Sequence, residues 1–227
     1  MKKINTLSLF FLHVLFSFSQ TVVDMTGRKF FEETNSNVLY TFQYTEIKVT
    51  PFLSDKWMRG KAFLDHEVSF DNLQIKLDLY NNKFIINWHD SSFQISTTVK
   101  QIELFPTGDT VNSLVFRNGY SITAKINART YLQVLADGKL TFLKYIKKEM
   151  NDFSEYSDAT KYKRFEEIDK YFIFANGQFR EITLNKKSLQ DILPDKWNEV
   201  ADYLTKYKVN IKVQEGWRLA IQYYNSL

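Results

Sequence analysis

A succession of short β-rich runs, each closed by a turn signal, constrains the fold of this chain most strongly. From Trp57 onward the runs recur about every ten residues, and no helical stretch separates them. The expected strands cover residues 57–64, 67–70, 73–80, 83–89, 91–97, 100–105, 111–117 and 120–126. This spacing predicts a mainly β protein: a β-sandwich or curved β-roll of about ten antiparallel strands.

Strict alternation in residues 73–79 shows which side chains should enter the core. Leu73, Ile75, Leu77 and Leu79 alternate with polar residues. Successive side chains of a strand point to opposite faces, so these four should be buried together while their neighbours face water.

Two dipeptides predict tight hairpins further along the chain. Asp137-Gly138 divides the β-rich stretch 130–145, and Asn176-Gly177 lies between two later β runs. Both dipeptides readily supply the two positive φ angles of a type I′ turn. Between the hairpins, residues 147–164 are highly charged and lack the pattern of a buried strand, so we expect an exposed connection or excursion there, in the form of a solvated loop or ribbon.

The end of the chain changes to a helical period. Val200, Tyr203, Leu204 and Tyr207 form a stripe at i, i+3, i+4 and i+7, and similar spacing occurs in 188–193 and 217–224. We therefore expect a β-rich domain over residues 20–184 and a helical C-terminal appendage, residues 185–227, packed on that domain.

Residues 1–19 have the pattern of a secretory signal peptide. Two lysines precede an apolar run of about a dozen residues, and small residues precede the expected cleavage point after Ser19. The run is shorter than the roughly 20 residues of a membrane-spanning helix. We therefore expect an exported protein of the periplasm, cell surface or medium, with no transmembrane segment after cleavage. The sequence has no Cys, which excludes disulfides and lipid attachment to a new N-terminal Cys.

Several blocks of sequence resemble a group of uncharacterised secreted and cell-envelope proteins of Bacteroidetes-type bacteria. They are the Trp-x-x-Gly block at Trp57–Gly60, with Pro-Phe-Leu before it, the Asp137-Gly138 hairpin, and Tyr-Tyr-Asn-Ser-Leu at 223–227. The resemblance implies envelope localisation and a β domain closed by a short helical tail. It supplies no catalytic residue.

The charge balance argues against a nucleic-acid partner. The formal net charge is +4, which falls to +2 once Lys2 and Lys3 are removed with the signal peptide. A nucleic-acid footprint needs clustered basic residues, and export also separates the chain from nucleic acid. No phosphate-binding Gly-rich loop or nucleophile motif is present, and no cofactor is expected.

Two histidines of the mature chain are the weak candidates for a metal site. Asp65-His66-Glu67 and Trp88-His89-Asp90 place imidazoles beside carboxylates at expected strand ends. If these ends met, His66, His89, Asp65 and Asp90 could bind zinc. Adjacent strand residues point to opposite faces, however, so solvated turn residues are the simpler interpretation.

The function best supported by sequence is therefore a non-enzymatic binding or interaction module with a protein or envelope-surface partner. A small envelope hydrolase or metal-dependent enzyme using His66 and His89 is the alternative, and a carrier of a small apolar ligand is a further one. A group of aromatic residues, Tyr156, Tyr162, Phe165 and Tyr171, could form a binding platform or pack on the core.

Overall fold

The computed structural model describes residues 29–35, 38–41, 49–64, 68–96, 98–108, 110–154 and 161–227, without the side chains of 153, 154, 161 and 162. The expected signal peptide, residues 1–19, lies outside this range. So do Asp65, His66 and Tyr156.

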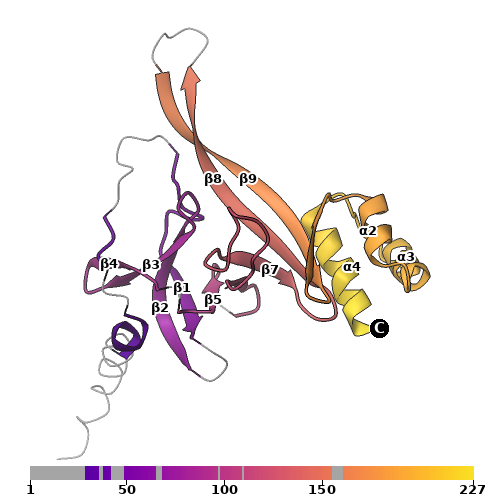
Figure 1. The fold of residues 1–227 in the computed structure, drawn as a ribbon, viewed down its shortest axis with the longest axis horizontal. Helices are drawn as coiled ribbons and strands as arrows, with labels where there is room; N and C mark the ends of the chain where they lie inside the picture. The colour runs from indigo at the N-terminus through magenta and orange to yellow at the C-terminus, as the bar shows by residue number, and fades with distance from the viewer. Residues whose placement is uncertain are drawn as a thin grey trace, which may run out of the picture.

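The described strands form one antiparallel sheet of ten strands (Figure 1). They are β1 (Met58–Phe63), β2 (Ser69–Asp78), β3 (Lys83–Trp88), β4 (Ser91–Gln94), β5 (Gln101–Phe105), β6 (Leu114–Arg117), β7 (Leu132–Ala136), β8 (Thr141–Ser154), β9 (Lys161–Ala175) and β10 (Gln178–Ile182). Their order in the sheet is β10-β9-β8-β7-β6-β5-β1-β2-β3-β4. The mainly β class and the number of strands predicted from sequence are confirmed.

Strand β2 is longer than predicted because a bulge takes the place of a turn. Gly60 of β1 pairs with Leu73, and Ala62 pairs with Phe70, so Asp71 and Asn72 together face one β1 residue. Asn72 has φ 59°, a left-handed conformation that Asn tolerates well. The interpretation of Asp71-Asn72 as a strand break was therefore wrong.

The two predicted hairpins both form, but only one has the expected turn. Asn176 and Gly177 have φ 50° and 76° between paired Ala175 and Gln178, as a type I′ turn requires. At the other hairpin only Gly138 has a positive φ, 151°, and residues 137–140 all lie between β7 and β8. The type I′ prediction for Asp137-Gly138 was wrong.

Residues 147–154 and 161–164 are strand, so of the loop or ribbon predicted there the ribbon is confirmed. Strands β8 and β9 pair continuously from Thr141 with Phe174 to Ser154 with Lys161. The distal part of this hairpin projects from the body of the protein as a two-stranded ribbon (Figure 1). Both faces of a projecting two-stranded ribbon can contact solvent, so its sequence carries charged residues on both faces and lacks the apolar alternation of a buried strand.

Three buried clusters hold the sheet together. The largest lies on β1, β2, β3, β5 and β6 and includes Leu73, Ile75, Leu77 and Leu79, which confirms the predicted core face. A second joins the helices to Phe142 and Ile173, and a third includes the next residue, Leu143. Because neighbours on a strand face opposite ways, the helices cover one face of β8 and the 118–130 segment covers the other.

The helical end forms as predicted, with α2 (Lys186–Ile192), α3 (Trp197–Lys206) and α4 (Gln214–Ser226). Trp217 of α4 is fully buried, lies 5.9 Å from the ring of Phe142, and donates its indole N–H to Ile211 O at 2.9 Å. Val200 of α3 is also fully buried, whereas Tyr207, the last residue of the predicted stripe, is 59% exposed. No helix in the described part of the chain has the length and apolar character needed to cross a membrane.

Candidate functional site

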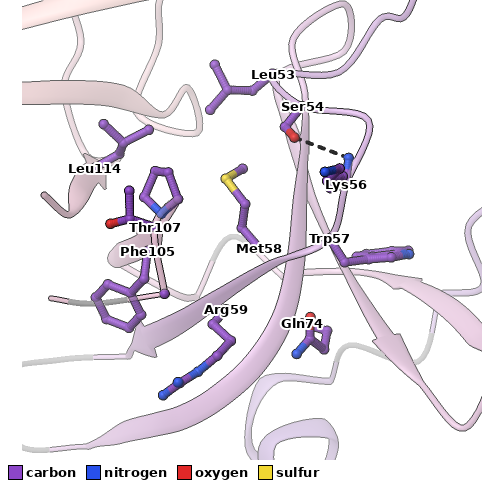
Figure 2. A pocket seen from close by; sticks show the side chains of 12 residues that line it. Leu53, Ser54, Lys56, Trp57, Met58, Arg59, Gln74, Phe105, Thr107 and Leu114 are labelled. Carbon is purple, nitrogen blue, oxygen red and sulfur yellow. Dashed lines mark hydrogen bonds between the residues drawn. The ribbon is translucent and has the colours of Figure 1, made fainter.

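An open pocket of about 560 Å³ lies at the beginning of β1 (Figure 2). Its lining comes from the 53–59 stretch, from the 105–108 turn after β5, and from single residues of β2 and β6. The lining residues are Leu53, Ser54, Lys56, Trp57, Met58, Arg59, Gln74, Phe105, Pro106, Thr107, Gly108 and Leu114. We call it the β1 pocket.

The register of the sheet places three side chains of the β1 pocket in one row. Arg59 pairs with Gln74 of β2 on one side and with Phe105 of β5 on the other. Directly paired residues share a face, so a guanidinium, an amide and a phenyl ring lie next to one another. Met58 points the opposite way in Figure 2, toward Leu53 and Leu114, and forms the apolar wall.

Two cations of the pocket face solvent without an ionic partner among the described residues. Lys56 and Arg59 are exposed, and neither forms an ion pair there. None of the described lining residues is acidic. An anion bound in the pocket would therefore meet positive charge that no carboxylate of the lining offsets.

Lys76 adds a third cation beside the pocket. Its ammonium lies 5.1 Å from the ring centre of Phe52 and 5.0 Å from that of Trp57. Such cation–π contacts orient the rings and the ammonium together. Burial lowers the pKa of Lys76, and the nearby Asp55 carboxylate partly offsets that effect.

The segment before β1, which contains Phe52, is held in place by a residue far away in the sequence. Lys148 of β8 donates from its ammonium to Thr50 O at 2.9 Å and to Phe52 O at 2.8 Å. Leu53 N also donates to Leu77 O at 2.9 Å. The segment before β1 is thus held on two sides, which makes the pocket a preformed feature of the fold.

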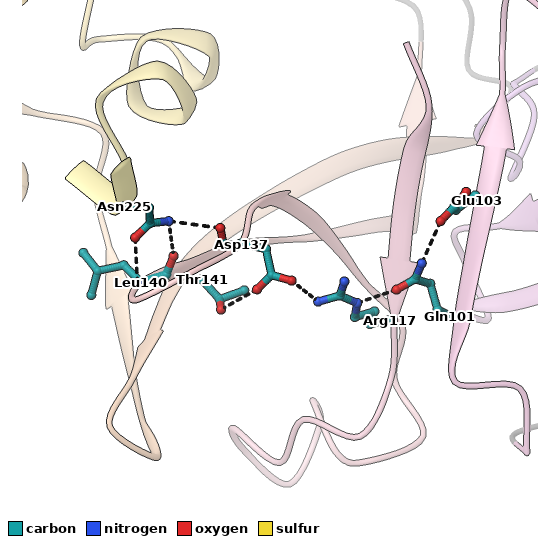
Figure 3. A network of polar contacts seen from close by, with 7 residues as sticks. All are labelled: Gln101, Glu103, Arg117, Asp137, Leu140, Thr141 and Asn225. Atoms are coloured by element: carbon teal, nitrogen blue, oxygen red, sulfur yellow. Dashed lines mark hydrogen bonds and ion pairs between the residues drawn. The ribbon is translucent and has the colours of Figure 1, made fainter. Parts of the chain in front are cut away.

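A chain of polar contacts runs from β5 to the C-terminal helix (Figure 3). Gln101 donates to Glu103 at 2.7 Å and accepts from Arg117 Nε at 2.6 Å, and Arg117 forms an ion pair with Asp137. Burial would raise the pKa of Asp137, but hydrogen bonds and charge from Arg117, with a bond from Thr141, lower it overall. Arg117 and Asp137 neutralise each other and Glu103 is held by the Gln101 amide, so this row is a structural network.

A second pocket, of about 680 Å³, lies on α2 and α3. Most of its charges are matched within the protein: Lys196 pairs with Glu199 at 3.0 Å, and Asp191 lies 3.7 Å from Arg180. Tyr224 donates to Asp195 at 3.3 Å. Because its carboxylates lie beside these partners and Lys187 is the one lining cation without an ion pair among the described residues, this pocket offers an anion less positive charge than the β1 pocket does.

Of the residues singled out for metal binding, only His89 and Asp90 lie within the described structure. His89 and Asp90 are exposed, with φ 46° and 60°, and they form the two-residue turn between Trp88 and Ser91. Their polar character is explained by this turn, which matches the simpler interpretation. Asp65 and His66 lie outside the described residues, and the described residues contain no cluster of three metal-ligating side chains.

The proposed aromatic platform is only partly within the described structure. Phe165 is buried and its ring lies 5.3 Å from that of Tyr80. Tyr171 stacks on Phe142 at 5.8 Å. Both rings therefore pack on the body of the protein. Sequence reasoning did not identify the β1 pocket, although the aromatic and basic residues of 56–59 could have suggested it.

Comparisons with protein-family models, with curated proteins and with solved structures gave no match to this chain.

Proposed function

We propose that this protein is an exported binding module that holds an acidic segment of a partner protein in the β1 pocket. The observation that carries the proposal is that exposed Lys56 and Arg59 line the pocket together with Phe105, which lies beside Arg59. Cations without a partner attract carboxylates, and Arg also binds them in a fixed two-point geometry. The ring of Phe105, which lies beside Arg59 on the same face of the sheet, offers an apolar surface next to the bound acid.

The volume of the pocket suits one or two side chains of a protein partner. A pocket of about 560 Å³ is within the range of ordinary small-ligand sites. The exposed turn at Pro106, Thr107 and Gly108 leaves one side open, so an extended peptide could enter and leave past it. The N-terminal signal pattern supports a partner in the cell envelope. Neither the enzyme nor the carrier hypothesis gains an observation from the described residues.

The test uses a fluorescein-labelled peptide, Glu-Glu-Phe-Glu-Glu, and its charge-inverted counterpart Lys-Lys-Phe-Lys-Lys. We expect anisotropy to rise only with the acidic peptide, and binding to weaken as salt is added. The double variant Lys56→Gln, Arg59→Gln should bind at least about tenfold less tightly, since a charged hydrogen bond contributes about 1.5–3 kcal/mol.

Matched controls separate the pocket from general charge. Lys212→Gln and Arg129→Gln remove the same two charges at exposed positions outside the pocket and should leave binding unchanged. Equal loss in both double variants would mean nonspecific attraction and would overturn the proposal. Binding of an oligogalacturonate, a polymer of acidic sugars, in place of the peptide would assign the site to a carbohydrate.

A further inference from the structure

Strand β9 presents a long edge that its neighbour in the sheet covers only in part. It pairs with β8 along its whole length, but with β10 only through Tyr171–Ala175. The backbone of residues 163–169 therefore continues beyond β10, in the projecting ribbon of Figure 1. An edge of this kind is a template for another strand, and natural proteins either cover it or protect it with charge.

The other edge of the ribbon is occupied near its base. Lys148 N of β8 donates to Leu79 O at 3.2 Å, and the Lys148 ammonium holds the segment before β1. Phe165, inward-facing in β9, packs on Tyr80. The ribbon is thus anchored to the body through β8 and through the Phe165 side chain, while the backbone edge of residues 163–169 pairs with no strand of the described sheet beyond β8.

The charges of β9 are arranged as a mirror image around Phe165. Two basic residues, Lys163 and Arg164, precede it, and two acidic residues, Glu166 and Glu167, follow it. If a second copy pairs antiparallel with Phe165 at the centre, Lys163 faces Glu167 of that copy and Arg164 faces its Glu166. Opposite charges in direct pairs stabilise a sheet, whereas parallel pairing would place like charges together.

We propose that the β9 edges of two copies pair antiparallel around Phe165 and form a twofold dimer. The contacts of a twofold interface are self-complementary, which is what this charge order provides. Lys163, Arg164 and Glu167 are exposed at this edge. Arg164 already bonds Glu166 of its own strand at 2.9 Å, and in the dimer the two such pairs form one alternating group of four charges.

Sedimentation equilibrium of the chain from Gln20 onward tests the dimer. The double variant Lys163→Glu, Arg164→Glu makes the edge wholly acidic, and Glu166→Lys, Glu167→Lys makes it wholly basic. For each double variant alone, the dissociation constant of the homodimer should be at least about tenfold higher than that of the unchanged protein. An equimolar mixture of the two should form a heterodimer. The fourfold exchange of all these charges should restore the homodimer, because the order is only inverted.

A second measurement reports the register directly. The protein has no Cys, so any disulfide comes from introduced residues. Lys163→Cys combined with Glu167→Cys should give covalent dimers on mild oxidation. Lys163→Cys alone should not, because the two copies of position 163 would lie roughly 13 Å apart along the strands. Circular dichroism should show unchanged strand content in every variant.

Two outcomes would overturn the proposal. A monomer at all concentrations would mean that the charges protect the edge from association, which is their other known use. A dimer that the charge reversals leave intact, or that the Lys163→Cys variant crosslinks alone, would place the interface elsewhere.

Discussion

The side-chain amide of Asn225 bonds the backbone of Leu140 in both directions. Asn225 Oδ1 accepts from Leu140 N at 2.9 Å, and Asn225 Nδ2 donates to Leu140 O at 2.8 Å and to Asp137 O at 3.2 Å (Figure 3). The amide thus acts like a strand partner for the turn between β7 and β8. It joins two stretches that sequence analysis noted separately, the Asp137-Gly138 turn and the C-terminal residues 223–227.

Replacing Asn225 by Ala should destabilise the protein by about 1–3 kcal/mol, because backbone groups of the turn lose their partners. Urea unfolding followed by circular dichroism measures this. Asn198→Ala, at an exposed position of α3, should change stability by less than about 0.5 kcal/mol. Equal effects of the two substitutions would mean that the amide contributes nothing specific.

Gly60→Ala should destabilise by about 1–3 kcal/mol or more through overpacking. An added Cβ would lie 2.6 Å from the Glu103 backbone oxygen and 2.8 Å from Ile75 Cδ1. The Gly177→Asn variant is a control, since that turn position is open and Asn tolerates its positive φ of 76°. Thermal melting compares the two. A Gly60→Ala protein as stable as the control would show that β1 and β5 can separate easily.

Asp78→Ala should destabilise the protein by about 3 kcal/mol, because it removes the shared acceptor of four hydrogen bonds. The fully buried Asp78 carboxylate accepts from Tyr40 Oη at 2.6 Å, Tyr80 N at 2.9 Å and two nitrogens of Asn81. Asp71→Ala in the same strand removes only an exposed ion pair with Lys61 and should cost less than about 1 kcal/mol. Similar urea midpoints for both would contradict the role of Asp78.

Stability should fall at alkaline pH partly through Tyr131. Its hydroxyl is buried and donates to Val99 O at 2.7 Å, and burial raises its pKa well above the ordinary value of 10.0. The unfolded chain therefore loses this proton at lower pH than the folded chain. The stabilisation is complete below about pH 10 and is lost as pH rises above it.

Chemical denaturation between pH 8 and 12 measures this effect. Tyr131→Phe should be less stable at pH 8, having lost a buried hydrogen bond, but should lose less further stability above pH 10. Parallel curves for the two proteins would show that Tyr131 does not contribute to alkaline unfolding. Tyr120, Tyr145, Tyr171 and Tyr224, whose pKa values burial also raises, contribute to the slope that remains in the variant.

The alternation of apolar and polar residues predicted much of the sheet, because this pattern arises wherever one face of a strand is buried and the other is exposed. Leu73 to Leu79 entered the core as expected, and Asn176-Gly177 formed its turn because both residues could adopt positive φ. Asp137-Gly138 has the same local signal but a different turn. There, Asn225 supplies hydrogen bonds from 85 residues away, and no local pattern contains that information.

The candidate site was harder to predict for the same reason. Lys56 and Arg59 are close in sequence, but the pocket exists only because β5 places Phe105 beside Arg59. His89 and Asp90 looked like ligands because a carboxylate followed an imidazole. The same two residues are also suited to a tight turn, and their positive φ angles show that this is their structural role.

The hydrogen bonds from Lys148 to the carbonyl oxygens of Thr50 and Phe52 also affect the order in which the strands can fold during synthesis. Those two carbonyls leave the ribosome early, and their partner follows 98 and 96 residues later. Until β8 has been made, the segment before β1 has only water for these bonds. Contacts between residues so distant in sequence slow folding. We therefore expect the N-terminal strands to reach their stable packing only after β8 has been made, rather than one after another as they emerge.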